Sequence, residues 1–434
     1  MRRALLAICM IMTVVFAFTQ IALADGALYP FYDGEDYRLM DTDGDMVEDL
    51  KCDYLTQMTT NDGKVRFIAY MSDSSGSHAE LLDEEGEILT DGDYDAIYYE
   101  NGAFLTISGD LYGIIDSDGD EILPVQYTSI VPTGEGTYFT STDDPYDSIA
   151  DELYLTSSDG ESRYICSSQG FMGNFSEGLL CAASRDGLYG YMNSSGQWSI
   201  APTYDTASDF CGGIAVVMRG SSYGLIDMSG NVILPIRYDA ISAWVSSANG
   251  SLGGDLSMII AMSGDSATIY DRATMLPLKT IGDIKYAYMP TSGIAVLGSD
   301  SATYVYSYSS NSIVLTIDPT YALEVLSDER ALVVDYDGGN VCIYDLTGAG
   351  ADVSFSDVTG AYGMYDDSGA CTVCICREDG GHTLWGVYSL DGTEILPIEY
   401  DTITRSCTDV FSVKQGSLSG LIRSDGQWIF RMGE

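Results

Sequence analysis

"YGLIDMSGNVILPIRYD", residues 223–239, recurs with small changes along this chain of 434 residues. Close copies are YGIIDSDGDEILPVQYT at 112–128, YGYMNSSGQWSIAPTYD at 189–205 and WGVYSLDGTEILPIEYD at 385–401. A shorter copy, SGLIRSDGQWIF, occupies 419–430. Because the same residue types return at fixed offsets, the chain is predicted to be built from one repeated structural unit.

The glycine of the aromatic–glycine pair marks the register of each copy. In the four complete copies a second glycine follows six residues later, a tyrosine fourteen residues later, and a proline two or three residues before that tyrosine. The marker positions of the strong copies are Gly113, Gly190, Gly224, Gly386 and Gly420. Weaker copies place other residues in the same slot: Arg38, Glu80, Tyr154, Thr268, Tyr304 and Cys342. Slots 38 to 420 span 382 residues in ten steps, about 38 residues per unit.

Each unit has the pattern of short β-strands. In the second strong copy, GLLCAASR (178–185) is a short apolar run, and LYGYMNSSGQWSI (188–200) is a hairpin with Ser-Gly at its turn. Glycine there supplies the positive φ of a tight turn, and the following proline marks a strand end or a bulge. Three or four strands per unit are predicted, with the repeated tyrosines and isoleucines (Ile130, Ile241, Ile403) in the core.

The pattern of aromatic-Gly, Asp/Asn/Ser three residues on, then Gly, Pro and Tyr-Asp resembles the WG (KWG) repeat of bacterial exported and surface proteins. Only Trp385-Gly386 has the literal Trp-Gly pair, and the repeat is badly eroded over 260–370. The resemblance implies a β-rich repeat array. It implies no particular activity, because the family has no established common one. The strong copies lie within five segments: 111–130, 188–207, 222–241, 384–403 and 418–430.

The predicted fold is all-β and propeller-like. Four short strands per unit are typical of a propeller blade, but ten or so units exceed the roughly 4–8 blades of most single propellers. An open β superhelix and two smaller propellers therefore remain alternatives.

Residues 1–24 have the features of a secretory signal peptide. Arg2 and Arg3 precede an apolar run over 4–18, and Ala22-Leu23-Ala24 supplies small residues for cleavage after Ala24. An uncleaved membrane anchor is the alternative. The repeat array would then occupy 25–434, and the protein is expected to be secreted or part of the cell envelope.

The charge of the chain limits the classes of partner. Without Arg2 and Arg3, 17 basic residues remain against 65 acidic ones, a formal charge of −48. This argues against binding to nucleic acid, and against binding to an anionic membrane beyond the signal segment. Hydrophobic residues make up 46% of the chain, so there is enough apolar material for a core.

The stretch DTDGDMVEDL (41–50) is a candidate calcium loop. Closely spaced carboxylates suit a hard cation, and four are available: Asp41, Asp43, Asp45 and Asp49. However, Met46 stands where such loops have glycine, and Cys52 stands where an EF-hand has glutamate. The repeat register gives an alternative, in which these residues form an ordinary hairpin turn equivalent to Asp116–Asp120.

A second candidate is a soft-metal or redox site in CTVCICREDGGH. Its potential ligands are Cys371, Cys374, Cys376 and His382. The alternative is a strand in which Cys374 corresponds to Val216 and Cys376 to Met218, as small core residues. Nine cysteines follow the signal segment, an odd number that cannot all pair within one chain.

No catalytic, cofactor-binding or metal-binding residue is assigned. The only histidines are His78 and His382, and the motifs of nucleophile elbows, phosphate loops and zinc proteases are missing from the sequence. No enzymatic activity and no cofactor are expected, and calcium is the ion favoured among the candidates.

We expect a non-catalytic binding or interaction module with a protein or glycan ligand. The alternatives are a structural component of the cell envelope and, less favoured, a glycan-active enzyme. Two inserted loops, at 141–152 and 246–257, are candidate contact segments. A contiguous stripe of exposed tyrosines would favour a carbohydrate or peptide ligand.

Overall fold

The computed structural model describes residues 28–432 except 33–35, 42–45, 48–49, 74–75, 91–93, 143–150, 169–172, 244–256, 351, 367–368 and 408. Every regular element among these residues is a β-strand. The described part of the chain therefore offers no helix that could cross a membrane. The predicted signal peptide and most of both inserted loops lie outside the described residues.

The described strands belong to two compact units. Unit 1 holds β1–β3 and β26–β41, and unit 2 holds β4–β25. The strands of unit 1 are β1 (Tyr29–Tyr32), β2 (Tyr37–Met40), β3 (Tyr54–Thr59), β26 (Tyr286–Tyr288), β27 (Ile294–Gly298), β28 (Thr303–Ser307), β29 (Ser312–Ile317), β30 (Ala322–Val325), β31 (Arg330–Asp335), β32 (Asn340–Asp345), β33 (Val353–Ser356), β34 (Gly360–Tyr365), β35 (Cys371–Asp379), β36 (His382–Tyr388), β37 (Glu394–Tyr400), β38 (Thr402–Cys407), β39 (Val410–Gln415), β40 (Leu418–Arg423) and β41 (Trp428–Met432).

Unit 2 contains the remaining strands. They are β4 (Val65–Asp73), β5 (Gly76–Leu82), β6 (Ala96–Glu100), β7 (Ala103–Ser108), β8 (Leu111–Ile115), β9 (Glu121–Tyr127), β10 (Ser129–Pro132), β11 (Thr137–Ser141), β12 (Asp151–Ser157), β13 (Ser162–Ser168), β14 (Phe175–Ser176), β15 (Leu179–Ala183), β16 (Tyr189–Asn193), β17 (Trp198–Tyr204), β18 (Thr206–Ala207), β19 (Ile214–Arg219), β20 (Ser222–Asp227), β21 (Val232–Tyr238), β22 (Ala240–Ser242), β23 (Met258–Ser263), β24 (Ser266–Asp271) and β25 (Pro277–Ile281).

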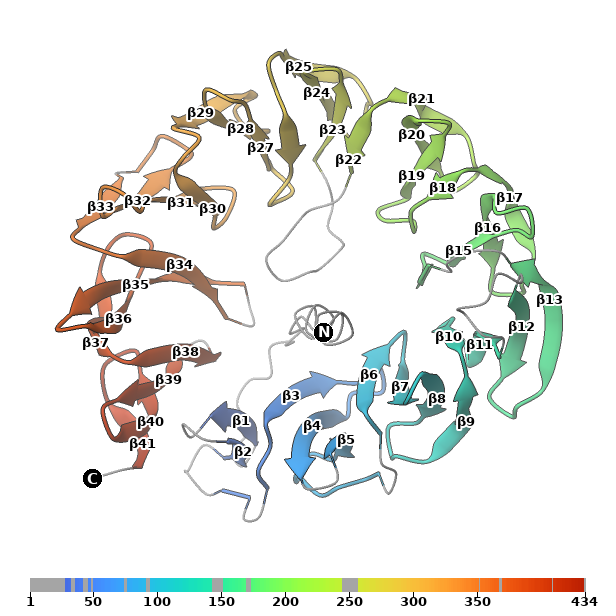
Figure 1. The fold of residues 1–434 in the computed structure, drawn as a ribbon, viewed down its shortest axis with the longest axis horizontal. Coiled ribbons are helices and arrows are strands. Elements are labelled where there is room, and N and C mark those ends of the chain that lie inside the picture. Colours follow the sequence, from blue (N-terminus) through green and yellow to red (C-terminus); the bar gives the residue numbers. More distant parts are fainter. Residues whose placement is uncertain are drawn as a thin grey trace. The chain divides into compact units, whose positions relative to one another are not determined.

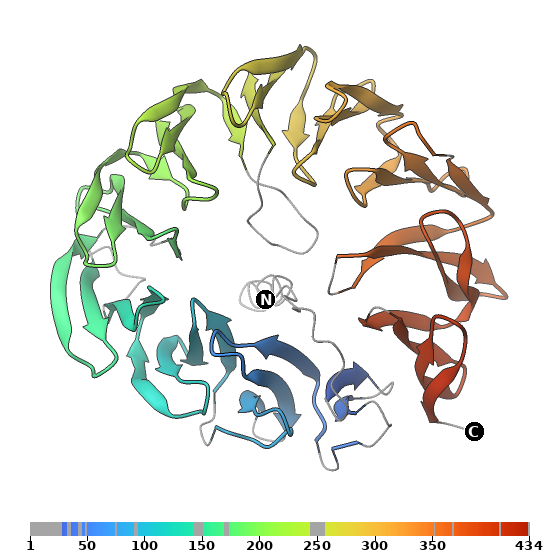
Figure 2. The same ribbon diagram turned by 180° about the vertical axis from the view of Figure 1, so that it is seen from behind.

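The sheets are small antiparallel meanders of the propeller-blade type. Among the described residues there are nine four-stranded sheets, from β6–β9 to β38–β41, together with the three-stranded β3–β4–β5 and the hairpin β1–β2. Within unit 1, the first strands β30, β34 and β38 lie on the inner side of their blades and the last strands on the outer side (Figures 1 and 2). The predicted all-β, propeller-like fold is confirmed.

The repeat register predicted from the marker positions is also confirmed. Nine slots, from Gly113 to Gly420, lie in the third strand of a four-stranded blade, and Glu80 lies in the third strand of the three-stranded sheet. The slot of Arg38 lies in β2, the second strand of the first hairpin. Even the eroded copies at Thr268, Tyr304 and Cys342 keep this place.

The marker glycine is needed because the fourth strand passes close over it. A Cβ at Gly224 would lie 2.8 Å from the carbonyl oxygen of Leu234 and 2.6 Å from the side chain of Ile236. The ladder is irregular here, with a shift of register between Tyr223 and Leu225, as expected for a bulge. Tyr223 itself pairs with Tyr238, so the first and last aromatic residues of the repeat face each other across strands.

The second glycine closes the hairpin turn. Gly230 has φ +80° and donates its N–H to the carbonyl of Asp227 over 2.8 Å. The Asp227 carboxylate caps the same turn by accepting N–H bonds from Ser229 and Asn231, both over 2.9 Å. This explains why the repeat has Asp, Asn or Ser three residues after the marker.

The aspartate that follows the last tyrosine anchors the link to the next blade. The carboxylate of Asp205 accepts the N–H of Gly220, in the second hairpin of that blade, over 2.6 Å. The same bond recurs from Asp95 to Gly109, Asp239 to Gly264 and Asp401 to Gly416, at 2.6–2.7 Å. Such charge-assisted bonds fix the position of one blade against the chain that leaves the previous one.

The hydrophobic core lies between consecutive blades. One cluster joins Val216, Leu225 and Leu234 of β18–β21 to Ile259 and Ala261 of β22–β25. The repeat tyrosines and isoleucines are buried as predicted, with 3–7% exposure: Tyr127, Tyr204, Tyr238, Tyr400, Ile130, Ile241 and Ile403.

Candidate binding site

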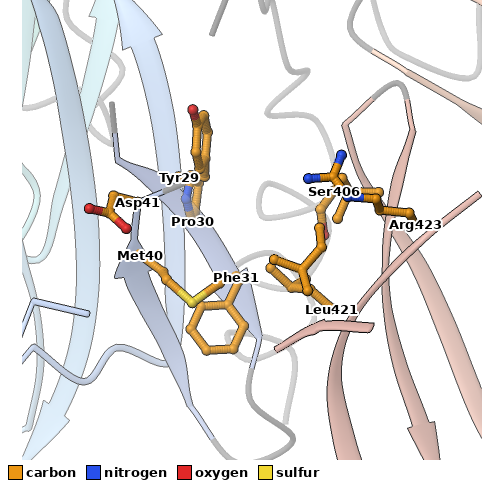
Figure 3. Close-up of a pocket in the computed structure, with 10 residues that line it drawn as sticks. Tyr29, Pro30, Phe31, Met40, Asp41, Ser406, Leu421 and Arg423 are labelled. Atoms are coloured by element: carbon orange, nitrogen blue, oxygen red, sulfur yellow. The ribbon is translucent and has the colours of Figure 1, made fainter. Parts of the chain in front are cut away.

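A cavity of about 70 Å³ lies inside unit 1, between the hairpin β1–β2 and the blade β38–β41 (Figure 3). Its lining residues come from both elements: Tyr29, Pro30, Phe31, Met40, Asp41, Ser406, Val410, Leu421, Arg423 and Ile429. We call it the seam cavity.

The strand pattern places these side chains together. Tyr29 and Phe31 alternate onto one face of β1, and Met40 joins them because it pairs with Tyr29 across the hairpin. Leu421 and Arg423 likewise share one face of β40. The two faces meet, and the seam cavity is the space left between them.

The floor of the seam cavity is apolar and buried. Phe31 and Met40 are each 2% exposed and Leu421 is 6% exposed. They form one cluster, in which Phe31 also packs edge-on against Phe430 with ring centroids 5.9 Å apart. This floor can hold an aliphatic group.

The blade side of the rim carries hydrogen-bond donors. Arg423 is exposed and Ser406 is half-buried, and both stand together on this side (Figure 3). Neither side chain makes a hydrogen bond or ion pair within the described residues. The neighbouring Arg405 differs, because its guanidinium bonds the carboxylate of Asp366 over 2.9 Å and the carbonyl of Ala370 over 2.8 Å.

Arg423 departs from the repeat at the turn-capping slot. This slot, three residues after the marker, holds Asp116, Asn193, Asp227 and Ser389 in the other strong copies. The turn still forms, since Gly426 donates its N–H to the carbonyl of Arg423 over 2.9 Å. Asp41 occupies the same slot in the first copy, so residues of one repeat position from both ends of the array line the seam cavity.

The acidic stretch 41–50 is described only in part. Asp43, Asp45 and Asp49 lie outside the described residues, and Met46 forms an isolated bridge to Met40. The hairpin alternative agrees with that bridge, and calcium binding stays a prediction.

The three cysteine candidates do not all lie together, because Cys374 and Cys376 share one face of β35 and Cys371 lies on the other. Cys371 and Cys374 lie three residues apart on β35, so they point to opposite faces of the sheet and pack in different core clusters. Burial raises the pKa of each thiol to about 12. His382 lies beyond them, paired with Asp379 at the hairpin end. Within the described residues, no cluster of three or more potential ligands could hold a metal ion.

Among the described residues, five tyrosines are exposed, and they are distributed over both units. They are Tyr164 (50%), Tyr286 (52%), Tyr321 (39%), Tyr336 (62%) and Tyr362 (39%). Tyr286 and Tyr362 lie in the first strands β26 and β34, and Tyr321 directly precedes the first strand β30. Three successive blades of unit 1, β26–β29, β30–β33 and β34–β37, therefore each have an exposed tyrosine in or next to the first strand.

Unit 2 contains a carboxyl pair that sequence patterns did not predict. Glu100 ends β6 and Asp209 follows β18. Burial raises the pKa of both carboxyl groups, and the charge of Asp209 raises that of Glu100 further. The N–H of Asn174 donates to Asp209 Oδ2 over 3.0 Å, while Oδ1 is buried and has no hydrogen-bond partner in the described structure. Because acidic residues are frequent along the chain, their spacing alone could not single out this pair.

Comparison with known proteins identifies the repeat. The family model described as "WG containing repeat" matches 112–144, 189–221, 223–247 and 385–416. This chain is a WG-repeat protein. Each WG segment begins at the third strand of one blade and continues into the next blade, as 189–221 does from β16 to β19. The expected exported or surface character is not established by this match.

Solved structures share only a distant likeness with the WG-repeat chain. A eukaryotic initiation factor is 12% identical over 70% of this chain and 90% of its own, with a TM-score of 0.42. AztD from Citrobacter koseri is 12% identical over 76% of this chain and 94% of its own, with a TM-score of 0.29. Hsv2 from Kluyvelomyces marxianus is 11% identical over 50% and 75%, with a TM-score of 0.28. No curated protein matches the sequence.

Proposed function

We propose that this WG-repeat protein is an exported, non-catalytic binding module that acts in the cell envelope or outside the cell. The observation that carries the proposal is that recurring residues of the repeat have structural roles, whereas other exposed residues do not. Residues that recur in the four complete copies pack the blades or close their turns, as Tyr238, Gly230 and Asp227 do. The exposed tyrosines lie outside that set, and Arg423 in the seam cavity stands in the turn-capping slot without the capping side chain, which leaves these residues available for a ligand.

The proposed ligand is a protein or a glycan. Exposed tyrosines present a flat apolar face and a polar hydroxyl, which suits sugars and peptides. The formal charge of −46 for the whole chain makes nucleic acid an unfavourable partner. The sequence 1–24 supports export of the protein.

The test is a binding survey with the purified protein against glycans, cell-wall sacculi and whole cells, with and without calcium. Saturable binding to one class of ligand is the expected result. A matched variant in which Tyr286, Tyr321 and Tyr362 are replaced by Ala should weaken it. Absence of saturable binding to every class would contradict the proposal and favour a structural role in the envelope. Calcium dependence would support the candidate loop at 41–49.

A further inference from the structure

We propose that the seam cavity binds a small aliphatic carboxylate, as found at the C-terminus of a polypeptide or in a short branched acid. This inference rests on the proposed role as a binding module and specifies the chemistry of one of its sites.

The apolar part of the ligand is assigned to the floor of the cavity. Phe31, Met40 and Leu421 offer no hydrogen-bonding group, so water held there is poorly satisfied and its displacement favours binding. A volume of about 70 Å³ is roughly half that of an apolar cavity of about 150 Å³ that holds benzene. This favours a short aliphatic group over a ring system.

The charged part of the ligand is assigned to Arg423. A guanidinium binds a carboxylate with two parallel charge-assisted hydrogen bonds, and the Ser406 hydroxyl stands on the same side as a further donor (Figure 3). The carboxylate of Asp41 points away from Arg423, so it does not occupy that position (Figure 3).

The replacement of a capping residue by arginine strengthens the assignment. In the other strong copies this slot closes a turn through Asp, Asn or Ser, whereas in the last copy Asp425 accepts the N–H of Gln427 over 2.9 Å. The Arg423 side chain therefore does not cap the turn. It lies on the face of β40 that meets the hairpin. In a chain this acidic, anions are repelled in general, so binding requires both the local cation and the apolar floor.

The experiment is a titration of the purified protein, followed by saturation-transfer NMR, with N-acetyl-L-leucine, N-acetyl-L-leucine amide and 4-methylpentanoate. We expect saturable binding of N-acetyl-L-leucine and at least about tenfold weaker binding of the amide, which lacks the charge. Arg423→Gln should weaken the binding of N-acetyl-L-leucine by a similar factor. The matched control Arg431→Gln, an exposed arginine of the same sheet, should change binding by less than about twofold.

Tighter binding of N-acetyl-L-leucine than of 4-methylpentanoate identifies a peptide terminus as the source of the carboxylate. Tighter binding of 4-methylpentanoate identifies a free acid. Equal binding of acid and amide, equal effects of the two arginine variants, or no saturation would overturn the assignment. If none of the carboxylates binds but saturable binding to glycans, sacculi or cells is found, the assignment fails while the binding module stands.

Discussion

Gly224 and its counterparts are retained for space, because the bulged fourth strand touches the position where a Cβ would lie. Gly230 is retained for conformation, because its φ is positive. Its counterparts Gly119, Gly196 and Gly392 also have positive φ, and a Cβ at each would in addition lie within 2.6 Å of a neighbouring residue. Two glycines six residues apart thus satisfy different physical demands.

Gly224→Ala should therefore lower the free energy of unfolding by about 2–3 kcal/mol, since backbone of the fourth strand would have to move. Urea unfolding monitored by circular dichroism measures this. Gly282→Ala is the matched control, because a Cβ there meets nothing within 4 Å. Equal effects of the two substitutions would contradict the explanation by close approach.

Glu100 gives a prediction on pH dependence. Its pKa is raised in the folded state by burial and by Asp209, so the folded state binds the proton more tightly than the unfolded state does. The carboxyl is therefore tolerated at low pH and destabilises the fold as pH rises through its raised pKa. Glu100→Gln should raise Tm by about 1–3 °C at pH 7 and by less at pH 4.

Thermal unfolding of wild type, Glu100→Gln and the exposed control Glu135→Gln at both pH values checks this. A Tm gain that is the same at pH 4 and pH 7 would show that the charge of Glu100 is not the cause.

At the scale of elements, blades are joined by a few polar contacts in addition to the core. One such contact in unit 1 is the ion pair between Arg405 of β38 and Asp366, which follows β34. The two side chains are 7% and 0% exposed, and their N–O distance is 2.9 Å. Arg405 also donates to the carbonyl of Ala370, so it fastens the first strand of one blade to the preceding blade.

Arg405→Met should lower the free energy of unfolding by about 3–5 kcal/mol, because the buried carboxylate of Asp366 would lose its cation. The double variant Asp366→Leu/Arg405→Met should recover most of that loss, since it leaves no buried charge. Denaturant unfolding of the two single variants and the double variant forms the cycle. A double variant as unstable as the additive sum would indicate that the ion pair is not the coupling contact.

At the scale of the whole molecule, the repeat pattern predicted the position of each copy along the chain, including eroded copies such as Thr268 and Cys342. That was possible because each blade is a local meander whose contacts lie within about 40 residues. The seam cavity could not be predicted in this way, because it needs contacts between residues such as Phe31 and Leu421, far apart in the sequence. The sequence signal at the cavity is Arg423, which stands in the turn-capping slot where the repeat has Asp, Asn or Ser. That departure can be interpreted only with the structure, which places Arg423 beside the hairpin.

Leu421→Ala tests the packing between the hairpin β1–β2 and the blade β38–β41. The substitution should lower the free energy of unfolding by about 2–4 kcal/mol. It should also raise the rate of hydrogen exchange in β1 and β2 as well as in β40, because Leu421 belongs to the cluster of Phe31 and Met40. Ile422→Ala is the matched control, since Ile422 packs on the opposite face with Val387 of the preceding blade. Equal exchange in the hairpin for both variants would show that Leu421 does not secure it.

The hairpin β1–β2 also sets an order of events during synthesis. Its partner strand β40 is made about 390 residues after Phe31, which at ribosomal rates is a delay of roughly 20–80 s. All strands of unit 2 leave the ribosome within that interval, and each can pair with a neighbour already made. The apolar face of the hairpin stays exposed until β40 has been synthesised. We expect a chaperone to bind this face of the nascent chain during that interval.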